Sequence, residues 1–322
     1  MAESYKQLTY EQRCQIYALK TSGKSGRRIA EQLGIHQSTV NRELKRNKGK
    51  RGYRFIQAQK KSVERRQARK GIPTKMTLEL KKRIEEKLAL QWSPEQISGW
   101  LKRENNDKAV ISHESIYQYI LQDRKAGGSL YKNLRRKAKK YFKRINGKTR
   151  RGQIKDRVGI EERPAIVEER SRLGDWEGDT IVGKDHQGAI VSLVERKSRY
   201  TLLRKVEKRK AERVKMAITL ALNPFKGFAL ETLTYDNGKE FAEHTAISKS
   251  LEVKTYFARP YHSWERGSNE NTNGLVRQYF PKKTDFATLS EEDVARVEYL
   301  LNNRPRKCLG YKTPAEVIQS AA

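Results

Sequence analysis

Three acidic residues lie where they could act together on a phosphodiester. Asp179 lies inside the segment GDWEGDTIVG, Asp236 ends the segment TLTYDNG, and Glu270 lies in GSNENTNG, with 33 residues between it and Asp236. Three carboxylates from separate elements can hold two magnesium ions about 3.5–4 Å apart, with positions left open for phosphate and water. The chemistry open to such a set is metal-assisted attack of water or a sugar hydroxyl on phosphorus.

Each acid also has neighbours that could serve in its place. Glu177 and Asp175 share the strand face of Asp179, because alternate residues of a strand point the same way. Glu240 lies one turn after Asp236. A lone aspartate at a strand end is more often a turn or cap residue than a ligand. The combination of three acids on separate elements is therefore what favours a metal site.

The elements that must position these acids lie in the second half of the chain. Residues 163–322 read as three successive strands, a helix, a strand, a helix, a fifth strand and then helices. This order is typical of an α/β domain with a mixed sheet. Asp179 falls on the first strand and Asp236 at the end of the fourth. Glu270 lies near the start of a helix that Ser268 or Asn269 could cap.

The chain carries a large excess of positive charge. Its 322 residues include 70 Lys and Arg against 38 Asp and Glu, a formal net charge of +32. Residues 1–150 hold 39 of the basic and only 13 of the acidic residues. Such an excess indicates a polyanionic partner, most plausibly nucleic acid, bound mainly by the first half.

Residues 1–50 have the pattern of a helix-turn-helix domain. Three short helices are expected over residues 8–47, with a turn at Gly34 before the third. The exposed start of that third helix would reach base edges and phosphates. A plain three-helix bundle is the alternative. The candidate DNA-contacting residues are Gln37, Ser38, Asn41 and Arg42.

Three further segments complete the first half. Residues 51–75 are a basic linker, helical after Tyr53, which either is solvated or lies along phosphates. Residues 76–123 resemble a second helix-turn-helix, with Ser93 and Ser112 as helix caps; a helical dimerisation module is the alternative. Residues 124–162 form a basic connector. The candidate DNA-contacting residues of the second module are His113, Ser115 and Gln118.

The motifs and their order resemble the DDE transposase and retroviral integrase superfamily, which has a ribonuclease H-like catalytic core. The likeness is closer to the transposases of the bacterial insertion-sequence-thirty (IS-thirty) family and covers nearly the whole chain. The segments that carry it are LTYEQRCQIYALKTSGKSGRRIAEQLGIHQSTVNREL, DWEGDTIVG, TYDNGKEF, ARPYHSWERGSNENTNGLVRQYFPK and LNNRPRKCLGYKTPAEV.

The resemblance implies a function and a set of residues. Asp179, Asp236 and Glu270 would be the catalytic metal ligands for two Mg²⁺ ions, with Mn²⁺ as a possible substitute. Arg277, two helical turns after Glu270, would contact terminal DNA phosphates; it could otherwise be an ordinary surface cation. The protein would be a DNA transposase that binds terminal inverted repeats of double-stranded DNA and target DNA, then cleaves and transfers strands. Joining two ends implies a homodimer or higher oligomer.

Two other functions stay open at this point. A catalytically inactive, transposase-derived DNA-binding regulator would keep the scaffold, although intact acids argue against it. A nuclease acting on RNA–DNA hybrids would share the fold but would not need two helix-turn-helix units.

The two cysteines, Cys14 and Cys308, suggest no disulfide framework or zinc site, and no apolar run reaches 18 residues. We expect a soluble protein of the bacterial cytoplasm, associated with the nucleoid.

Overall fold

The computed structural model describes residues 7–70, 76–135, 154–260 and 262–320. The chain divides into two compact units, Met1–Lys75 and Met76–Ala322. Residues 136–153 of the basic connector expected over 124–162 lie outside the described residues. No helix in the described ranges is long and apolar enough to cross a membrane.

The N-terminal unit contains the three helices and the glycine turn predicted for a helix-turn-helix. They are α1 (Tyr10–Thr21), α2 (Gly26–Leu33) and α3 (Gln37–Asn47). Gly34 ends α2 with a φ of 61°, a left-handed conformation that glycine adopts without steric cost. Ile16, Ile29 and Val40 are fully buried between the helices. The small core thereby fixes the angle between α2 and α3.

A fourth helix, α4 (Phe55–Lys70), packs onto this bundle. The Phe55 ring lies against the rings of Tyr10 and Tyr17, with centroids 5.6 and 5.5 Å away, and Ala58 is fully buried. The helix expected after Tyr53 is therefore present. It is a packed part of the N-terminal unit rather than a solvated segment.

The second unit begins with three more helices. They are α5 (Leu78–Ala89), α6 (Pro94–Glu104) and α7 (His113–Lys125), followed by the 3-10 turn η1 (Leu130–Asn133). Ser93 caps α6 in a capping box with Gln96, and Ser112 caps α7, as predicted. Their core is buried around Ile84, Leu88 and Ile116.

A five-stranded mixed sheet forms the centre of the second unit. Its strands are β1 (Asp175–Val182), β2 (Ala189–Glu195), β3 (Thr201–Val206), β4 (Thr232–Tyr235) and β5 (Lys254–Phe257). The order is β3-β2-β1-β4-β5. The β1–β2 and β2–β3 pairs are antiparallel, whereas β1–β4 and β4–β5 are parallel. This is the topology of a ribonuclease H-like domain, so the predicted fold class is confirmed.

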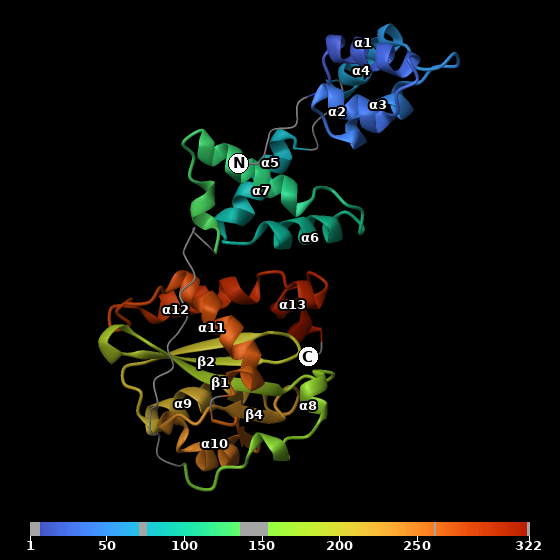
Figure 1. The fold of residues 1–322 in the computed structure, drawn as a ribbon. Coiled ribbons are helices and arrows are strands. Elements are labelled where there is room, and N and C mark those ends of the chain that lie inside the picture. The colour runs from blue at the N-terminus through green and yellow to red at the C-terminus, as the bar shows by residue number, and fades with distance from the viewer. Residues whose placement is uncertain (1–6, 71–75, 136–153, 261, 321–322) are drawn as a thin grey trace. The chain divides into compact units, whose positions relative to one another are not determined.

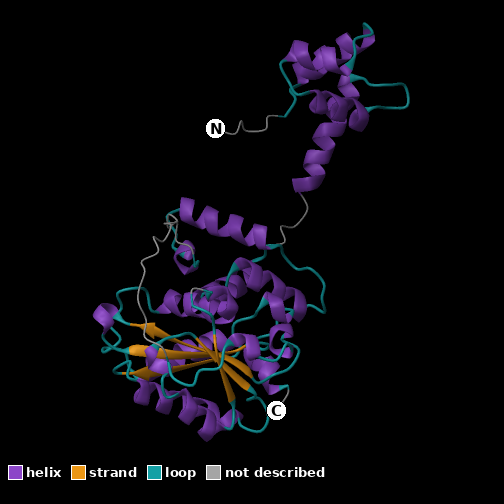
Figure 2. Ribbon diagram, turned by 60° about the horizontal axis from the view of Figure 1, so that its bottom comes forward, coloured by secondary structure: helices purple, strands orange, loops and turns teal. Residues whose placement is uncertain are grey.

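Helices cover both faces of the sheet (Figures 1 and 2). On one face, α9 (Ala211–Leu222) and α10 (His244–Leu251) close a core that contains Trp176, Leu193 and Ile218. On the other, α11 (Gly267–Tyr279) and α12 (Glu291–Asn302) close a second core around Ile190 and Leu275. The remaining short helices are α8 (Ile166–Glu169) and α13 (Pro314–Gln319). Burial on two faces explains why β2 is apolar along most of its length.

Within the second unit, α6 packs against the C-terminal segment of the chain. A Cβ added at Gly99 would meet the Tyr311 ring at 2.3 Å, so the absence of a side chain permits this approach. Arg103 donates from both terminal nitrogens to Glu316, at 2.9 and 2.7 Å. The segment YKTPAEV therefore serves as the contact point for the second helical module.

Candidate active site

The register of two parallel strands brings Asp179 and Asp236 side by side. The last register pair between β1 and β4 is Glu177 with Thr234. Asp179 and Asp236 each lie two residues beyond that pair, and alternate residues of a strand point to the same face. Neighbouring strands are roughly 4.8 Å apart. Two acids that are 57 positions apart in the sequence are thus neighbours at one edge of the sheet.

Two hydrogen bonds hold the carboxylate of Asp179, and a third orients one of its partners. Its Oδ1 accepts from the backbone N–H of Thr180 at 2.8 Å, and its Oδ2 accepts from Asn273 Nδ2 at 2.9 Å. Asn273 Oδ1 in turn accepts from the Ser192 hydroxyl at 2.8 Å. α11 and β2 therefore both orient the first acid.

Arg266 lies between the two aspartates. Its Nη1 is 3.5 Å from Asp179 Oδ2, and its Nη2 is 3.8 Å from Asp236 Oδ2. The same Nη1 donates to the carbonyl of Gly178 at 3.3 Å, and the side chain is only 11% exposed. Its Nε is buried without a hydrogen-bond partner among the described residues. One guanidinium therefore lies within ion-pair distance of both carboxylates.

Glu240 is a third acid beside the pair. It is buried, accepts from the Thr180 hydroxyl at 2.7 Å and lies 3.5 Å from Arg209 Nη1. A Cβ at Gly238 would fall 2.4 Å from Glu240 Oε2 and 2.8 Å from Asp236 Oδ1. Glycine at position 238 therefore allows both carboxylates to lie close to the backbone.

Glu270 is exposed on α11 and does not join the aspartates in this conformation. Within the described residues, no three His, Cys, Asp or Glu side chains are grouped closely enough to hold a metal ion. Glu270 and Asn273, three residues apart, nevertheless share one face of α11, and Arg266 lies at the cap position four residues before Glu270. Arg266 and Asn273 both contact Asp179, and Glu270 lies between them along this face.

The other two acids of β1 are buried and already paired. Glu177 accepts from Arg196 Nη1 at 2.6 Å and from the backbone N–H of Asn269 at 2.9 Å. Asp175 accepts from Arg172 and from the Thr232 hydroxyl. Both carboxylates are therefore structural.

The expected cap of α11 by Ser268 or Asn269 is wrong. The helix begins at Gly267, and Arg266 at the cap position makes no side-chain cap. Ser268 and Asn269 lie inside the first turn, where Ser268 accepts from Arg199. The buried Glu177 takes an N-terminal N–H group of the helix instead, as carboxylates do at the positive end of a helix.

Burial raises the pKa of Asp179 to about 6. Arg266 opposes this rise, whereas the negative charges of Asp236 and Glu240 add to it. The carboxylate is 22% exposed, so little water stabilises its charge. A divalent cation held by both aspartates would offset more of this cost than the single charge of Arg266 does.

Arg277 is half-buried rather than free on the surface. Its Nη2 donates to the carbonyl of Val182 at 2.6 Å, and its guanidinium lies 5.5 Å from the centroid of the Phe286 ring. Burial lowers its pKa from the ordinary arginine value. The Arg277 side chain therefore reaches from α11 to the last residue of β1, the strand that also contains Asp179.

The candidate DNA-contacting side chains of the first module lie at the exposed start of α3. Gln37, Ser38, Asn41 and Arg42 are all exposed. Ser38 is the most constrained of them, because its hydroxyl and its backbone N–H both bond His36 Nδ1, at 2.8 and 3.2 Å.

The candidate DNA-contacting side chains of the second module lie at the exposed start of α7. His113, Ser115 and Gln118 are exposed, but Ser115 bonds the capping Ser112 hydroxyl at 2.9 Å. Gln118 donates to Glu114 at 2.9 Å. His113 is thus the least constrained of the three.

Sequence reasoning missed Arg266 as a site residue. Its signal was its position one helical turn before Glu270, within WERGSNEN. Arginine is more often a surface residue, so the spacing alone does not single it out. Only the register of β1 and β4 shows that two carboxylates face it.

The donor set fits a hard divalent cation in part. Asp179 and Asp236 already direct one oxygen each toward the same guanidinium, and carboxylate oxygens are the ligands that Mg²⁺ prefers. The absence of a side chain at Gly238 lets the carboxylates of Asp236 and Glu240 lie close to the backbone beside this pair. A third ligand from Glu270 requires a different side-chain position from the exposed one described here.

Two domain models match this chain. One, described as a helix-turn-helix domain, matches residues 4–47, and the other, described as an integrase core domain, matches residues 170–263.

Curated relatives match nearly end to end. The transposase for insertion sequence element IS4351 of Bacteroides fragilis is 45% identical, over 97% of this chain and 95% of its own length. Transposase InsI for element IS30C of Escherichia coli (strain K12) is 39% identical, over 97% of this chain and 83% of its own. The transposase for IS1086 of Cupriavidus metallidurans is 39% identical, over 98% and 94%.

Solved structures with similarity to this chain include two retroviral catalytic cores. The core domain of BIV integrase is 21% identical with a TM-score of 0.35, covering 45% of this chain and 94% of that one. The core domain of HTLV-2 integrase in complex with magnesium is 20% identical with a TM-score of 0.36, covering 45% and 96%.

Proposed function

Because the chain belongs to the IS30 family of insertion-sequence transposases, we propose that it binds terminal inverted repeats of its element and catalyses metal-dependent strand cleavage and strand transfer. The observation that carries the catalytic part is the placement of Asp179 and Asp236 on either side of one cation, the Arg266 guanidinium. Two partly buried acids that share a cation on the adjacent strands β1 and β4 are suited to hold Mg²⁺ or Mn²⁺.

Asp179, Asp236 and Glu270 would be the ligands. Asn273 holds Asp179 through its amide and keeps the carboxylate aimed at the common position. Metal ions bound there would lower the pKa of the attacking water or hydroxyl and stabilise the leaving oxygen.

The proposed reaction has two in-line steps. In the first, water attacks a phosphodiester at the element end, the P–O3′ bond breaks, and the element strand leaves with a free 3′-hydroxyl. In the second, that hydroxyl attacks a target phosphodiester, the new P–O3′ bond forms, and the displaced target strand leaves with its own 3′-hydroxyl. Both steps lose one proton from the attacking oxygen and return one to the leaving oxygen. No covalent protein–DNA link is needed.

Arg266 has a role in this proposal that follows from its position. The two aspartates must release its guanidinium before they can hold a divalent ion, since all three groups converge on one place. Once released, the guanidinium would lie beside the reacting phosphate and stabilise its negative charge. Arg277 at the end of β1 would contact the terminal phosphates of the DNA.

The N-terminal modules would supply DNA recognition. Exposed residues at the start of α3 and α7 would enter the major groove, and the basic excess would hold the backbone. Two element ends must meet for strand transfer, so a homodimer or a larger assembly acting on DNA in the bacterial cytoplasm is part of the proposal.

A labelled oligonucleotide that carries the element end tests this function. Wild-type protein with Mg²⁺ should release a cleaved strand with a 3′-hydroxyl, and Asp236→Asn should bind the same DNA without cleaving it. Equal cleavage by both would sink the proposal. Equal and specific binding without cleavage by either would instead favour the inactive, transposase-derived regulator.

A further inference from the structure

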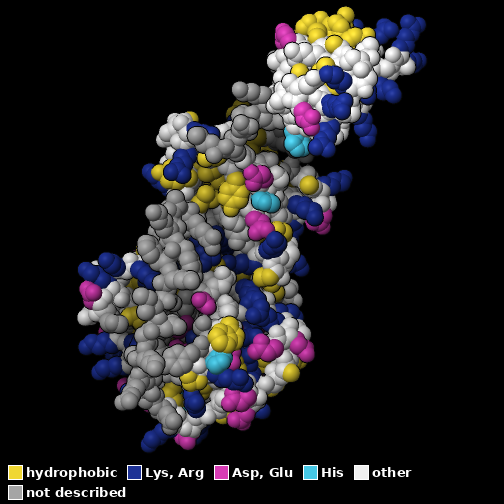
Figure 3. Space-filling model, viewed as in Figure 1, with side chains coloured by type: hydrophobic (Ala, Val, Ile, Leu, Met, Phe, Trp, Pro, Cys, Tyr) yellow, Lys and Arg dark blue, Asp and Glu magenta, His cyan; other side chains and the backbone are white. Residues whose placement is uncertain are grey.

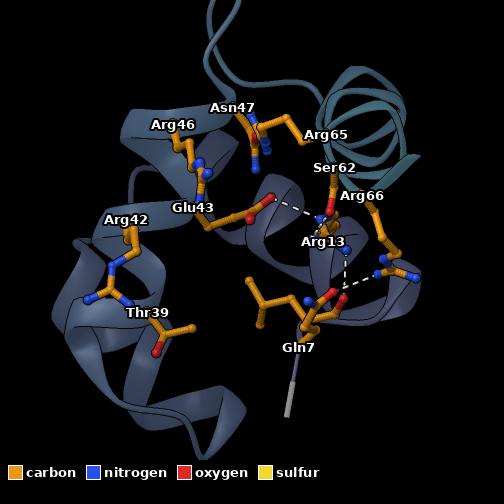
Figure 4. Close-up of a pocket in the computed structure, with 11 residues that line it drawn as sticks. Gln7, Arg13, Thr39, Arg42, Glu43, Arg46, Asn47, Ser62, Arg65 and Arg66 are labelled. Carbon is orange, nitrogen blue, oxygen red and sulfur yellow. Dashed lines mark hydrogen bonds and ion pairs between the residues drawn. The ribbon is translucent and has the colours of Figure 1, made fainter. Parts of the chain in front are cut away.

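The N-terminal unit contains a small pocket between α3 and α4 in which five of the eleven lining residues are arginines. Its volume is about 140 Å³, enough for a tetrahedral oxyanion but not for a nucleoside. Figure 4 shows the α3 side chains on one side of the pocket and those of α4 on the other. The basic residues that line it are Arg13, Arg42, Arg46, Arg65 and Arg66.

Helical spacing explains how both helices contribute. Thr39, Arg42, Glu43 and Arg46 lie at intervals of three and four residues, so they share one face of α3. On α4, Ser62, Arg65 and Arg66 repeat this spacing and face the same space. The packing of Phe55 and Ala58 fixes α4 at this distance.

The one acid in the pocket is already neutralised. Glu43 Oε1 accepts from Arg13 Nε at 2.9 Å, and both side chains are less than 10% exposed. The same oxygen accepts from the Tyr53 hydroxyl at 3.1 Å. Arg13 also donates to Ser62 Oγ at 3.2 Å. This buried pair forms the floor of the pocket and adds no net charge.

The other four arginines have no carboxylate partner among the described residues. Arg65 donates to the Asn47 side chain, and Arg66 Nη2 donates to Gln7 Oε1 at 2.6 Å, both neutral acceptors. In the part of the chain that the structure describes, Arg42, Arg46, Arg65 and Arg66 make no ion pair. The pocket therefore has a formal charge of +4 with no carboxylate to offset it. Like charges brought this close favour an anion, since each guanidinium can give a phosphate two parallel hydrogen bonds.

We propose that this pocket clamps one backbone phosphate of the DNA that α3 reads, which makes α4 part of the DNA-binding surface. This inference rests on the proposed function of α3. Gln37, Ser38 and Asn41 lie on the neighbouring face of the helix, and a helix in the major groove is flanked by backbone. Figure 3 shows Lys and Arg side chains over the surface of this unit, and at the pocket the arginines of α3 and α4 line the same space.

The test uses full-length protein and a fluorescent oligonucleotide carrying the element end, with binding measured by anisotropy across a series of KCl concentrations. Loss of one phosphate contact should reduce the slope of log K against log salt by about 0.9. We expect Arg65→Gln with Arg66→Gln to show this change and a fall in affinity of roughly 10-fold. The matched control is Arg54→Gln with Lys60→Gln, which removes the same charge beside a different cavity along α4. An equal change of slope in the two double variants would overturn the proposal. It would mean that the four residues only contribute to the general positive potential of the unit and that none contacts a particular phosphate.

A second measurement locates the phosphate. Single methylphosphonate substitutions, which neutralise one phosphate each, should weaken wild-type binding at one position much more than at its neighbours. In the Arg65→Gln, Arg66→Gln double variant, methylphosphonate at that position should no longer weaken binding. In the Arg65→Lys, Arg66→Lys double variant part of the weakening should return, which would exclude misfolding as the cause. Equal sensitivity at the position in wild type and the Gln double overturns the proposal.

Two further results distinguish DNA from free phosphate and test the function of α3 separately. Inorganic phosphate at 10 mM, added against chloride of matched ionic strength, should not compete; competition would overturn the assignment to DNA in favour of a free phosphate. Wild-type protein that binds end and random DNA equally would contradict the proposed function of α3. The methylphosphonate result would still report on the clamp.

Discussion

Arg266 lies between Asp179 and Asp236, with Nη1 3.5 Å from one carboxylate and Nη2 3.8 Å from the other. Two acids on adjacent parallel strands would repel each other at this separation without a counter-charge. The arginine thus keeps together a pair of carboxylates that the proposed chemistry needs. It also competes with any ion that the pair would hold.

Removing Arg266 should separate these two effects. In Arg266→Gln the aspartates lose their shared cation, so the melting temperature without metal should fall by a few degrees. Affinity for Mn²⁺ should rise, roughly 10-fold, because no guanidinium has to be released. Isothermal titration of the full-length protein with Mn²⁺ measures the affinity, and scanning calorimetry in chelator measures the stability.

Arg209→Gln is the matched control for this comparison. It removes one positive charge near Glu240 but none from between the aspartates. If Arg266→Gln binds Mn²⁺ more weakly than both wild type and this control, the guanidinium does not occupy the cation position.

Protonation of Asp179 should make stability and metal binding depend on pH in opposite directions. Its pKa of about 6 lies above the ordinary value of 3.8, so the native state binds the proton more readily than the unfolded chain. The resulting cost to stability is present above pH 6 and disappears as the pH falls toward 4. Mn²⁺ affinity should decline over the same fall, because the neutral acid is a poor ligand.

Asp179→Asn provides the comparison for that prediction. Without metal it should be more stable than wild type at pH 8, by about 1–3 kcal/mol, and the gain should shrink toward pH 4.5. Denaturant titrations at both pH values measure it. A gain that is equal at the two pH values would mean that Asp179 does not carry the raised pKa.

Asn273 is a positioning residue that acts through Asp179. Asn273→Ala removes the amide that donates to Oδ2, so cleavage should slow by about 10- to 100-fold. Loss of a donor to the charged form should also raise the pKa of Asp179, which moves the midpoint of the pH–rate profile upward. Asn271→Ala, at an exposed position on the same helix, should change neither. A fall in rate with an unmoved midpoint would indicate a merely structural role.

The contact between α6 and the C-terminal segment predicts that a glycine-to-alanine substitution in this helix lowers the stability of the protein. Alanine in place of an interior helical glycine ordinarily stabilises by up to about 1 kcal/mol. Gly99→Ala should instead destabilise, because its Cβ would meet the Tyr311 ring at 2.3 Å. Thermal denaturation of wild type, Gly99→Ala, Tyr311→Ala and the double variant forms a double-mutant cycle. The loss of stability caused by Gly99→Ala should disappear when Tyr311 is replaced by alanine. Stabilisation by Gly99→Ala alone would show that the contact does not form.

Local patterns in the sequence determined much of this protein. The glycine turn at Gly34, the caps at Ser93 and Ser112 and the order of strands and helices could all be predicted, because each depends on residues close together in the chain. Asp179 and Asp236 could be identified as candidates for the same reason, since Asp179 lies within a short strand motif and Asp236 lies at the end of another. The family resemblance then supplied the order of the acids.

Only the tertiary structure decided how these residues meet. Parallel register between β1 and β4 sets Asp179 beside Asp236, and no local pattern encodes that register. The same packing buries Arg266 between them, turns Glu270 outward, and gives the N-terminal N–H of α11 to Glu177 instead of a cap. Such contacts join residues that are tens of positions apart. Their free energy depends on burial and on the distances between charges, which exist only once the chain has folded.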